Sequence, residues 1–85
     1  PAIVAGDMNM HPTDAVSVGR FEGAGLVDAA DATGDPCRTT SAEPTSSCDR
    51  PDWVWVTPDL DIARFAIGDA SASDHLPIEV TVTLP

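Results

Sequence analysis

Three short segments of the sequence carry side chains of the kinds that perform hydrolytic chemistry. They contribute Asp7 and Asn9, then Asp52, and finally Asp74 and His75. Hydrolysis of a phosphate ester requires a divalent cation, an activated water molecule and neutralisation of the charge at phosphorus. Carboxylates, an amide and an imidazole supply these parts when a fold brings them to one place. These five residues are therefore the candidate site.

Each segment alone has a simpler explanation. An Asp or Asn that follows a glycine is most often a turn residue, which applies to Asp7 and Asn9. The Ser-Asp-His tripeptide at residues 73–75 is common in loops, and Asp52 could simply begin a strand. The three segments carry weight only together and in this order.

Together the segments resemble the closing motifs of the endonuclease/exonuclease/phosphatase superfamily. Those motifs are G-D-x-N, an Asp followed by an aromatic residue on a strand, and S-D-H, and residues 6–9, 52–53 and 73–75 match them in order. The family's first half, which supplies an early Asn, a metal-binding Glu and a further His or Tyr, has no counterpart here. We therefore expect residues 1–85 to form the C-terminal half of an α/β (α+β) domain, a four-layer α/β/β/α sandwich.

The resemblance implies a role for each candidate residue. Asp7 would orient and deprotonate the attacking water, and Asn9, two residues further along an extended chain, would bind a phosphate oxygen. His75 would contact the scissile phosphate, while Asp52 would hold its imidazole by a hydrogen bond. Asp74 would take part in binding the metal, which we expect to be Mg²⁺, with Mn²⁺ or Ca²⁺ as substitutes.

The implied function is divalent-metal-dependent hydrolysis of a phosphodiester or phosphomonoester in nucleic acid, a phospholipid or an inositol phosphate. We expect the 85-residue chain alone to be inactive and to need the N-terminal half of the domain as its partner. Two alternatives stay open. One is a non-catalytic binding or interaction module that keeps the fold without a complete metal site. The other is a small secreted, disulfide-stapled protein whose motifs are coincidental.

The charge of the chain argues against passive electrostatic binding to nucleic acid or to an anionic membrane. Four arginines and no lysine stand against 14 acidic residues, which gives a net charge of -10. Affinity for phosphate chains comes mostly from cationic side chains. An acidic enzyme can still act on phosphate through a divalent cation that bridges carboxylates and phosphate oxygens. No apolar window is long enough for a transmembrane helix.

Cys37 and Cys48 flank a polar segment rich in Thr, Ser and Pro. Their spacing suits a disulfide that closes a loop and stabilises the fold by up to about 3 kcal/mol. Such a bridge implies an oxidising compartment, so we expect an extracellular, secreted protein. Two free thiols in a cytosolic loop are the alternative. No zinc site follows, because a third and a fourth ligand are missing at the required spacing.

The hydrophobic pattern predicts the elements that must position the candidate residues. Strands are expected at residues 1–5, 53–56, 62–67 and 76–84, and a helix at residues 13–22. Thr13 or Asp14 would cap the helix, which would bury Val16 and Phe21. Glycines at its end would terminate it.

Alternation along residues 52–56 places Asp52, Val54 and Val56 on one face of a strand and both tryptophans on the other. We expect Trp53 to pack against the helix. The valine face would normally pack on the absent half of the domain, so we expect it to be exposed and to drive formation of a homodimer or aggregation.

Arg38 directly follows Cys37, and Arg50 lies two residues after Cys48. We expect both to form surface pairs with nearby acids such as Asp35 and Asp49. Contact with an anionic substrate is the alternative.

Overall fold

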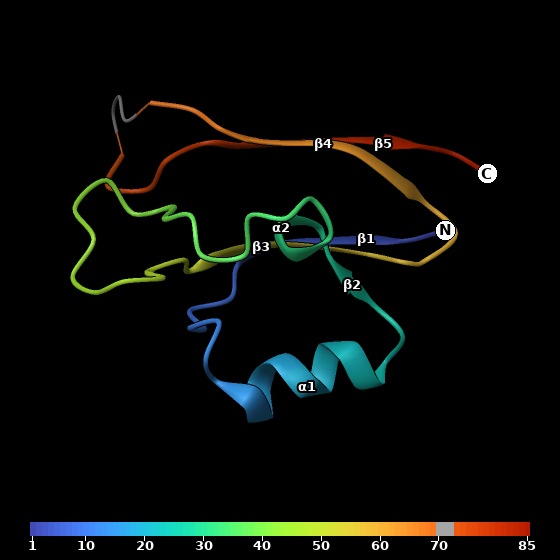
Figure 1. Cartoon of the computed structure of the whole chain (residues 1–85), viewed down its shortest axis with the longest axis horizontal. Coiled ribbons are helices and arrows are strands. Elements are labelled where there is room, and N and C mark those ends of the chain that lie inside the picture. The colour runs from blue at the N-terminus through green and yellow to red at the C-terminus, as the bar shows by residue number, and fades with distance from the viewer. Residues whose placement is uncertain (70–72) are drawn as a thin grey trace.

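The chain folds into three layers, seen here in a computed structural model that describes residues 1–69 and 73–85 (Figure 1). Helix α1 covers one face of a sheet built from β1, β3 and β2, and the hairpin of β4 and β5 lies over the other face. The elements are β1 (Ile3–Asp7), α1 (Ala15–Gly23), β2 (Val27–Asp28), α2 (Ala29–Ala32), β3 (Asp52–Val56), β4 (Asp61–Ile67) and β5 (Ile78–Thr83). This mixture of helices and antiparallel sheets confirms the expected fold class.

The three-stranded sheet has the order β1-β3-β2, and both pairings are antiparallel. Strand β1 runs to residue 7 instead of ending at residue 5 as expected. Its register against β3 places Ile3 opposite Val56 and Asp7 opposite Asp52. Both acidic residues therefore belong to the sheet itself, at the end where β1 stops and β3 begins.

The two tryptophans of β3 form the core between this sheet and α1. Trp53 and Trp55 are buried, and their rings stack with centroids 5.3 Å apart. Phe21 of α1 stacks on Trp55 at 4.9 Å. The indole N–H of Trp53 donates to the carbonyl of Met10 at 3.2 Å, which holds the loop after β1 against the core. Val18 and Phe21 of α1 pack against the buried cluster of Met10, Trp53 and Trp55, which agrees with the predicted packing of Trp53 on the helix side.

Helix α1 begins where the sequence predicts, because the Asp14 side chain accepts a hydrogen bond from the backbone N–H of Ser17 at 3.2 Å. The prediction that Val16 is buried is wrong, since 69% of it is exposed. Val18 packs on the core together with Phe21. These two residues are three apart and share a helix face, whereas Val16 lies nearly opposite Val18.

The expected exposure of Val54 and Val56 is also wrong. Val56 is fully buried and Val54 is half-buried, because the β4–β5 hairpin lies over this face of β3. The exposed strand is β1, in which 54% of Ile3 and 39% of Val4 are accessible to solvent. Within this sheet, exposed apolar surface thus lies along β1 and not on the valine face of β3.

The hairpin of β4 and β5 has the half-exposed character that the alternation at residues 76–84 predicts. Inward residues Ile78, Val80 and Val82 are half-buried, and the residues between them are exposed. A register shift lies between Ile62 and Arg64, the irregularity expected of a β-bulge.

Between α2 and β3 the chain is mostly loop, as expected, and Cys37 and Cys48 are joined in a disulfide. The bridge closes the polar segment into a loop whose far end leads directly into β3. This disulfide fits an extracellular protein. Neither helix in the described ranges is long and apolar enough to cross a membrane.

Candidate active site

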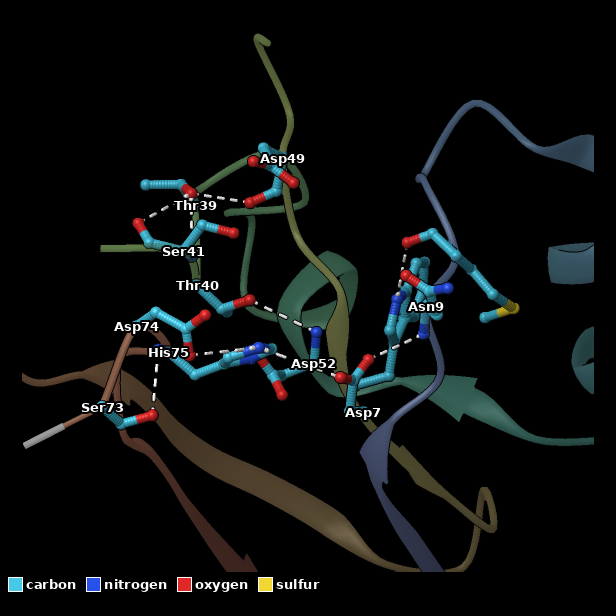
Figure 2. Close-up of polar contacts among 12 residues, drawn as sticks. Asp7, Asn9, Thr39, Thr40, Ser41, Asp49, Asp52, Ser73, Asp74 and His75 are labelled. Atoms are coloured by element: carbon cyan, nitrogen blue, oxygen red, sulfur yellow. Dashed lines mark hydrogen bonds and ion pairs between the residues drawn. The ribbon is translucent and has the colours of Figure 1, made fainter. Parts of the chain in front are cut away.

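Asp7 and Asp52 face each other across the paired ends of β1 and β3. They are direct partners in the antiparallel register, so their side chains project from the same face of the sheet. His75 reaches them from the segment that precedes β5. Its Nδ1 lies 2.7 Å from Asp52 Oδ2, and its Nε2 lies 3.9 Å from Asp7 Oδ2 (Figure 2). One imidazole thus lies against two carboxylates.

The hydrogen bond between Asp52 and His75 is the one that the sequence motifs imply. Asp52 is the more buried partner, with 19% of its side chain exposed against 36% for His75. This hydrogen bond and the charge of Asp52 raise the pKa of His75, and the charges of Asp74 and Asp7 add to the effect. Because Asp52 accepts at Nδ1, the Nε2 of the ring remains directed toward Asp7.

Asn9 is not on an extended strand, which corrects the expectation for how it follows Asp7. Strand β1 ends at Asp7, and the backbone N–H of Asn9 donates to Asp7 Oδ1 at 2.9 Å. The φ angle of Asn9 is 49°, a left-handed conformation that Asn adopts more readily than most residues. The turn explanation is therefore correct for this hydrogen bond, while the second oxygen of Asp7 faces His75.

Asp74 lies at the rim of the site, with 93% of its side chain exposed and its Oδ1 3.9 Å from His75 Nε2. The ligand atoms of Asp7, Asp52 and His75 lie within 4.8 Å of one another, and Asp74 is outside this group. Its role as a metal ligand stays a prediction, as do the catalytic roles of Asp7, Asn9, Asp52 and His75.

The donor set suits a divalent cation. Two carboxylates directly opposite each other on a sheet repel, and a bound cation relieves that repulsion. Mg²⁺ is usually held by one or two carboxylates, with water and substrate phosphate completing its shell. Carboxylate oxygens suit Mg²⁺, Ca²⁺ and Mn²⁺, whereas the imidazole is a ligand type that also suits later transition metals.

One residue that holds the site together was missed in the sequence. Thr40 is fully buried, and its hydroxyl accepts a hydrogen bond from the backbone N–H of Asp52 at 3.2 Å. It lies in the polar loop outside all three motifs. The adjacent threonines at residues 39–40 were the only local signal, and nothing in hydrophobic periodicity distinguishes them.

Arg50 contradicts the expectation of a surface pair. Only 1% of its side chain is exposed, and its two terminal nitrogens donate to the carboxylate of Asp28 at 3.1 and 2.7 Å. Its guanidinium also lies 3.7 Å from the ring centroid of Trp53. Arg38 does form the expected surface pair, with Asp35 at 3.8 Å. Arg50 is therefore a structural residue beneath the site and not a free contact for substrate.

A model of the endonuclease/exonuclease/phosphatase family matches residues 1–75. The chain belongs to this family. The matched range includes every candidate residue, so the hypothesis that the motifs are coincidental is wrong. Searches among curated proteins and among solved structures gave no match. The endonuclease/exonuclease/phosphatase family is a phosphoesterase-type superfamily whose members are usually hydrolytic and generally use divalent metals.

Proposed function

We propose that this chain is the C-terminal part of a divalent-metal-dependent phosphoesterase that hydrolyses phosphodiesters or phosphomonoesters. The observation that carries the proposal is the placement of Asp7 and Asp52 as cross-strand partners around the imidazole of His75. A fold has little structural use for two facing carboxylates at a solvent-accessible strand end, because like charges there are destabilising. Such a site suits a reaction in which a proton is transferred and a negatively charged group is bound.

We assign the tasks of Asp7, Asp52 and His75 from their contacts, and that of Asn9 from the G-D-x-N motif. Asp52 fixes the tautomer of His75 and favours the protonated ring, whose Nε2 then faces the negative charge of a bound phosphate. Asp7 keeps one oxygen in the turn with Asn9 and presents the other to orient a water molecule and accept its proton. Asn9 binds a phosphate oxygen through its amide.

The rim residue Asp74 would take part in holding the cation beside the group formed by Asp7, Asp52 and His75, and for this cation we propose Mg²⁺, with Mn²⁺ or Ca²⁺ as substitutes. A bound cation supplies Lewis-acid polarisation of a phosphoryl oxygen. A cation is also the simplest way for a chain of net charge -10 to hold an anionic substrate, nucleic acid among the candidates.

The same proposal includes the N-terminal half of the domain as the partner that completes the site. The exposed edge strand β1 supports it, since β1 is paired on one side only within the described residues. The 85-residue chain alone would then be inactive. The disulfide supports an extracellular, secreted enzyme.

Cation binding by the 85-residue chain tests the site without requiring activity. We expect titration calorimetry with Mn²⁺ to show one site, and Asp7→Asn to weaken it about tenfold or more. Asp59→Asn is the matched control, because Asp59 is an exposed acid near the other end of β3. Equal binding by both variants would contradict the metal site and favour the non-catalytic binding module.

Activity is tested in the protein that joins this chain to an upstream half of the same domain. We expect hydrolysis of bis(p-nitrophenyl) phosphate that EDTA abolishes. Replacing His75 with Ala should lower kcat by about a hundredfold to ten-thousandfold, the usual contribution of a positioned acid or base. Unchanged kcat in the folded His75→Ala protein would contradict the assigned role.

A further inference from the structure

We propose that Thr40 is a positioning residue for the proposed phosphoesterase site, and that residues 39–42, the bridge segment, set the distance between Asp52 and His75. The inference rests on the proposed function for its catalytic consequence only. Its structural basis is a set of contacts that joins the start of β3 to the segment before β5.

Thr40 holds the start of β3 on one side. Its hydroxyl accepts from the backbone N–H of Asp52 at 3.2 Å, and its own N–H donates to the carbonyl of Asp49 at 3.3 Å. The side chain is fully buried. The backbone position of Asp52, and hence of its carboxylate, is therefore tied to Thr40.

The bridge segment holds the His75 segment on its other side. The backbone N–H of Leu76 donates to the carbonyl of Thr40 at 2.6 Å, and the N–H of Ala42 donates to the carbonyl of Asp74 at 2.8 Å. Ser41 pairs with His75 as an isolated antiparallel bridge. Backbone bonds thus lie on both sides of the imidazole-bearing residue, and Figure 2 shows Thr40 beside the Asp52–His75 pair.

Thr39 fixes the bend in the bridge segment that lets Thr40 contact both the start of β3 and the segment that carries His75. Its hydroxyl donates to the carbonyl of Asp49 at 2.6 Å and accepts from the N–H of Ser41 at 3.0 Å. Asp52 begins β3 and His75 lies 23 residues away in the segment before β5, yet their side chains meet at 2.7 Å. A catalytic pair requires placement to within about 0.5 Å. The bridge segment provides a short, hydrogen-bonded connection between them.

Threonine suits this position for two reasons. Its hydroxyl supplies the acceptor for Asp52, and its branched side chain has few rotamers, which keeps that oxygen in place. Valine has nearly the same shape but leaves the N–H of Asp52 without its partner. Serine keeps the acceptor and loses only a methyl group. The two substitutions therefore separate the hydrogen bond from packing.

The test is an NMR measurement on the 85-residue chain in EDTA. A hydrogen-bonded Nδ1–H of His75 gives a proton resonance downfield of the amide region, and Asp52→Asn assigns it by removing it. We expect this resonance in the parent chain and in Thr40→Ser, and its loss in Thr40→Val. Thr33→Val is the matched control, because the Thr33 hydroxyl donates to helix carbonyls of α2 and not to the site.

An unchanged resonance in folded Thr40→Val would overturn the proposal. Should that variant fail to fold, Thr39→Val tests the same segment at a half-buried position, and persistence of the resonance there would equally overturn it. In the active protein, Thr40→Val should lower kcat by about tenfold to a hundredfold with KM unchanged. Because the resonance does not depend on hydrolysis, a failed phosphoesterase assay and a failed positioning role give different results.

Discussion

The guanidinium of Arg50 lies between the indole of Trp53 and the carboxylate of Asp28, with 1% of the side chain exposed. Arg50 stands two residues before Asp52, and Asp28 belongs to β2 at the other edge of the sheet from β1. The pair therefore ties the start of β3 to β2 and to the cap of α2, whose first turn Asp28 also holds.

Removing the negative partner of Arg50 should be strongly destabilising. Asp28→Asn keeps the shape and the helix cap but leaves a buried cation unpaired, so we expect the free energy of unfolding to fall by about 3 to 5 kcal/mol. Urea denaturation followed by tryptophan fluorescence measures this. Asp35→Asn, which breaks the exposed pair with Arg38, should change it by less than about 1 kcal/mol. Similar losses for both variants would contradict a buried pair.

The protonation of His75 should depend on Asp52. The hydrogen bond and charge of Asp52 raise the pKa of His75, so Asp52→Asn should lower it. NMR titration of the imidazole in EDTA measures both values. An unshifted His75 in Asp52→Asn would contradict the hydrogen bond.

The raised pKa of His75 also sets the sign of a stability effect. The protonated ring is favoured in the folded state, so its contribution is fully present below the unfolded pKa of about 6.5. That contribution disappears as the pH rises through the higher folded pKa. Stability in EDTA should therefore fall over this interval, and the fall should be smaller in Asp52→Asn.

At the scale of elements, the disulfide loop connects the start of β3 to the segment before β5 at the site. The bridge segment lies within the loop that Cys37 and Cys48 close. The loop therefore influences both the stability of the fold and the geometry of the Asp52–His75 pair.

Replacing both cysteines with serine should lower the free energy of unfolding by up to about 3 kcal/mol, because the unfolded chain regains the freedom of that loop. Urea denaturation of the double variant measures the change. Ser46→Ala changes the same loop without opening it and should leave the denaturation midpoint nearly unchanged. A double variant as stable as the parent would show that tertiary contacts alone order the loop.

The sequence predicts the elements that have a strong local signal. Alternation identifies β3 and assigns Trp53 and Trp55 to one face, because a strand has a period of two. Asp14 predicts the start of α1, because its side chain can cap the helix. Val16 was assigned to the wrong helix face because a nine-residue helix carries too few apolar residues to fix its rotation. Arg50 was placed at the surface because arginine is rarely buried without a partner, and its partner is distant in sequence.

The site was predictable only through the family's motifs. Asp52 and His75 are brought together by tertiary structure, and no local pattern relates them. The motifs predict that Asp52 and His75 are paired. They do not predict the turn at Asn9, because that turn depends on where β1 ends. The burial of Thr40 was not predictable, because it follows from the path of a loop. Tertiary contacts set that path, and sequence periodicity does not.

At the scale of the whole molecule, the distribution of exposed apolar surface determines where the chain can associate with another copy. Ile3 and Val4 lie on β1, which is paired on one side only among residues 1–69 and 73–85, while the valine face of β3 is covered. Unpaired strand edges are templates for pairing with another chain. The homodimer expected from the sequence therefore stays a prediction, with its surface moved to β1.

The isolated chain should self-associate through β1. We expect sedimentation velocity to show a larger average mass at higher protein concentration, more strongly in high salt, because copies with a net charge of -10 repel at low ionic strength. Ile3→Lys should suppress the association. Val16→Lys introduces the same charge at an exposed residue of α1 and should not. Equal suppression by both would point to a general charge effect.

The facing carboxylates of Asp7 and Asp52 have a thermodynamic consequence beyond catalysis. In the absence of a cation, their mutual repulsion opposes the antiparallel pairing of β1 with β3 in the three-stranded sheet. A cation that binds only the folded chain raises stability by about 2.7 kcal/mol at a hundred times its Kd. The midpoint of thermal unfolding would then report the free concentration of the ion, and the chain would fold most completely where the metal is abundant.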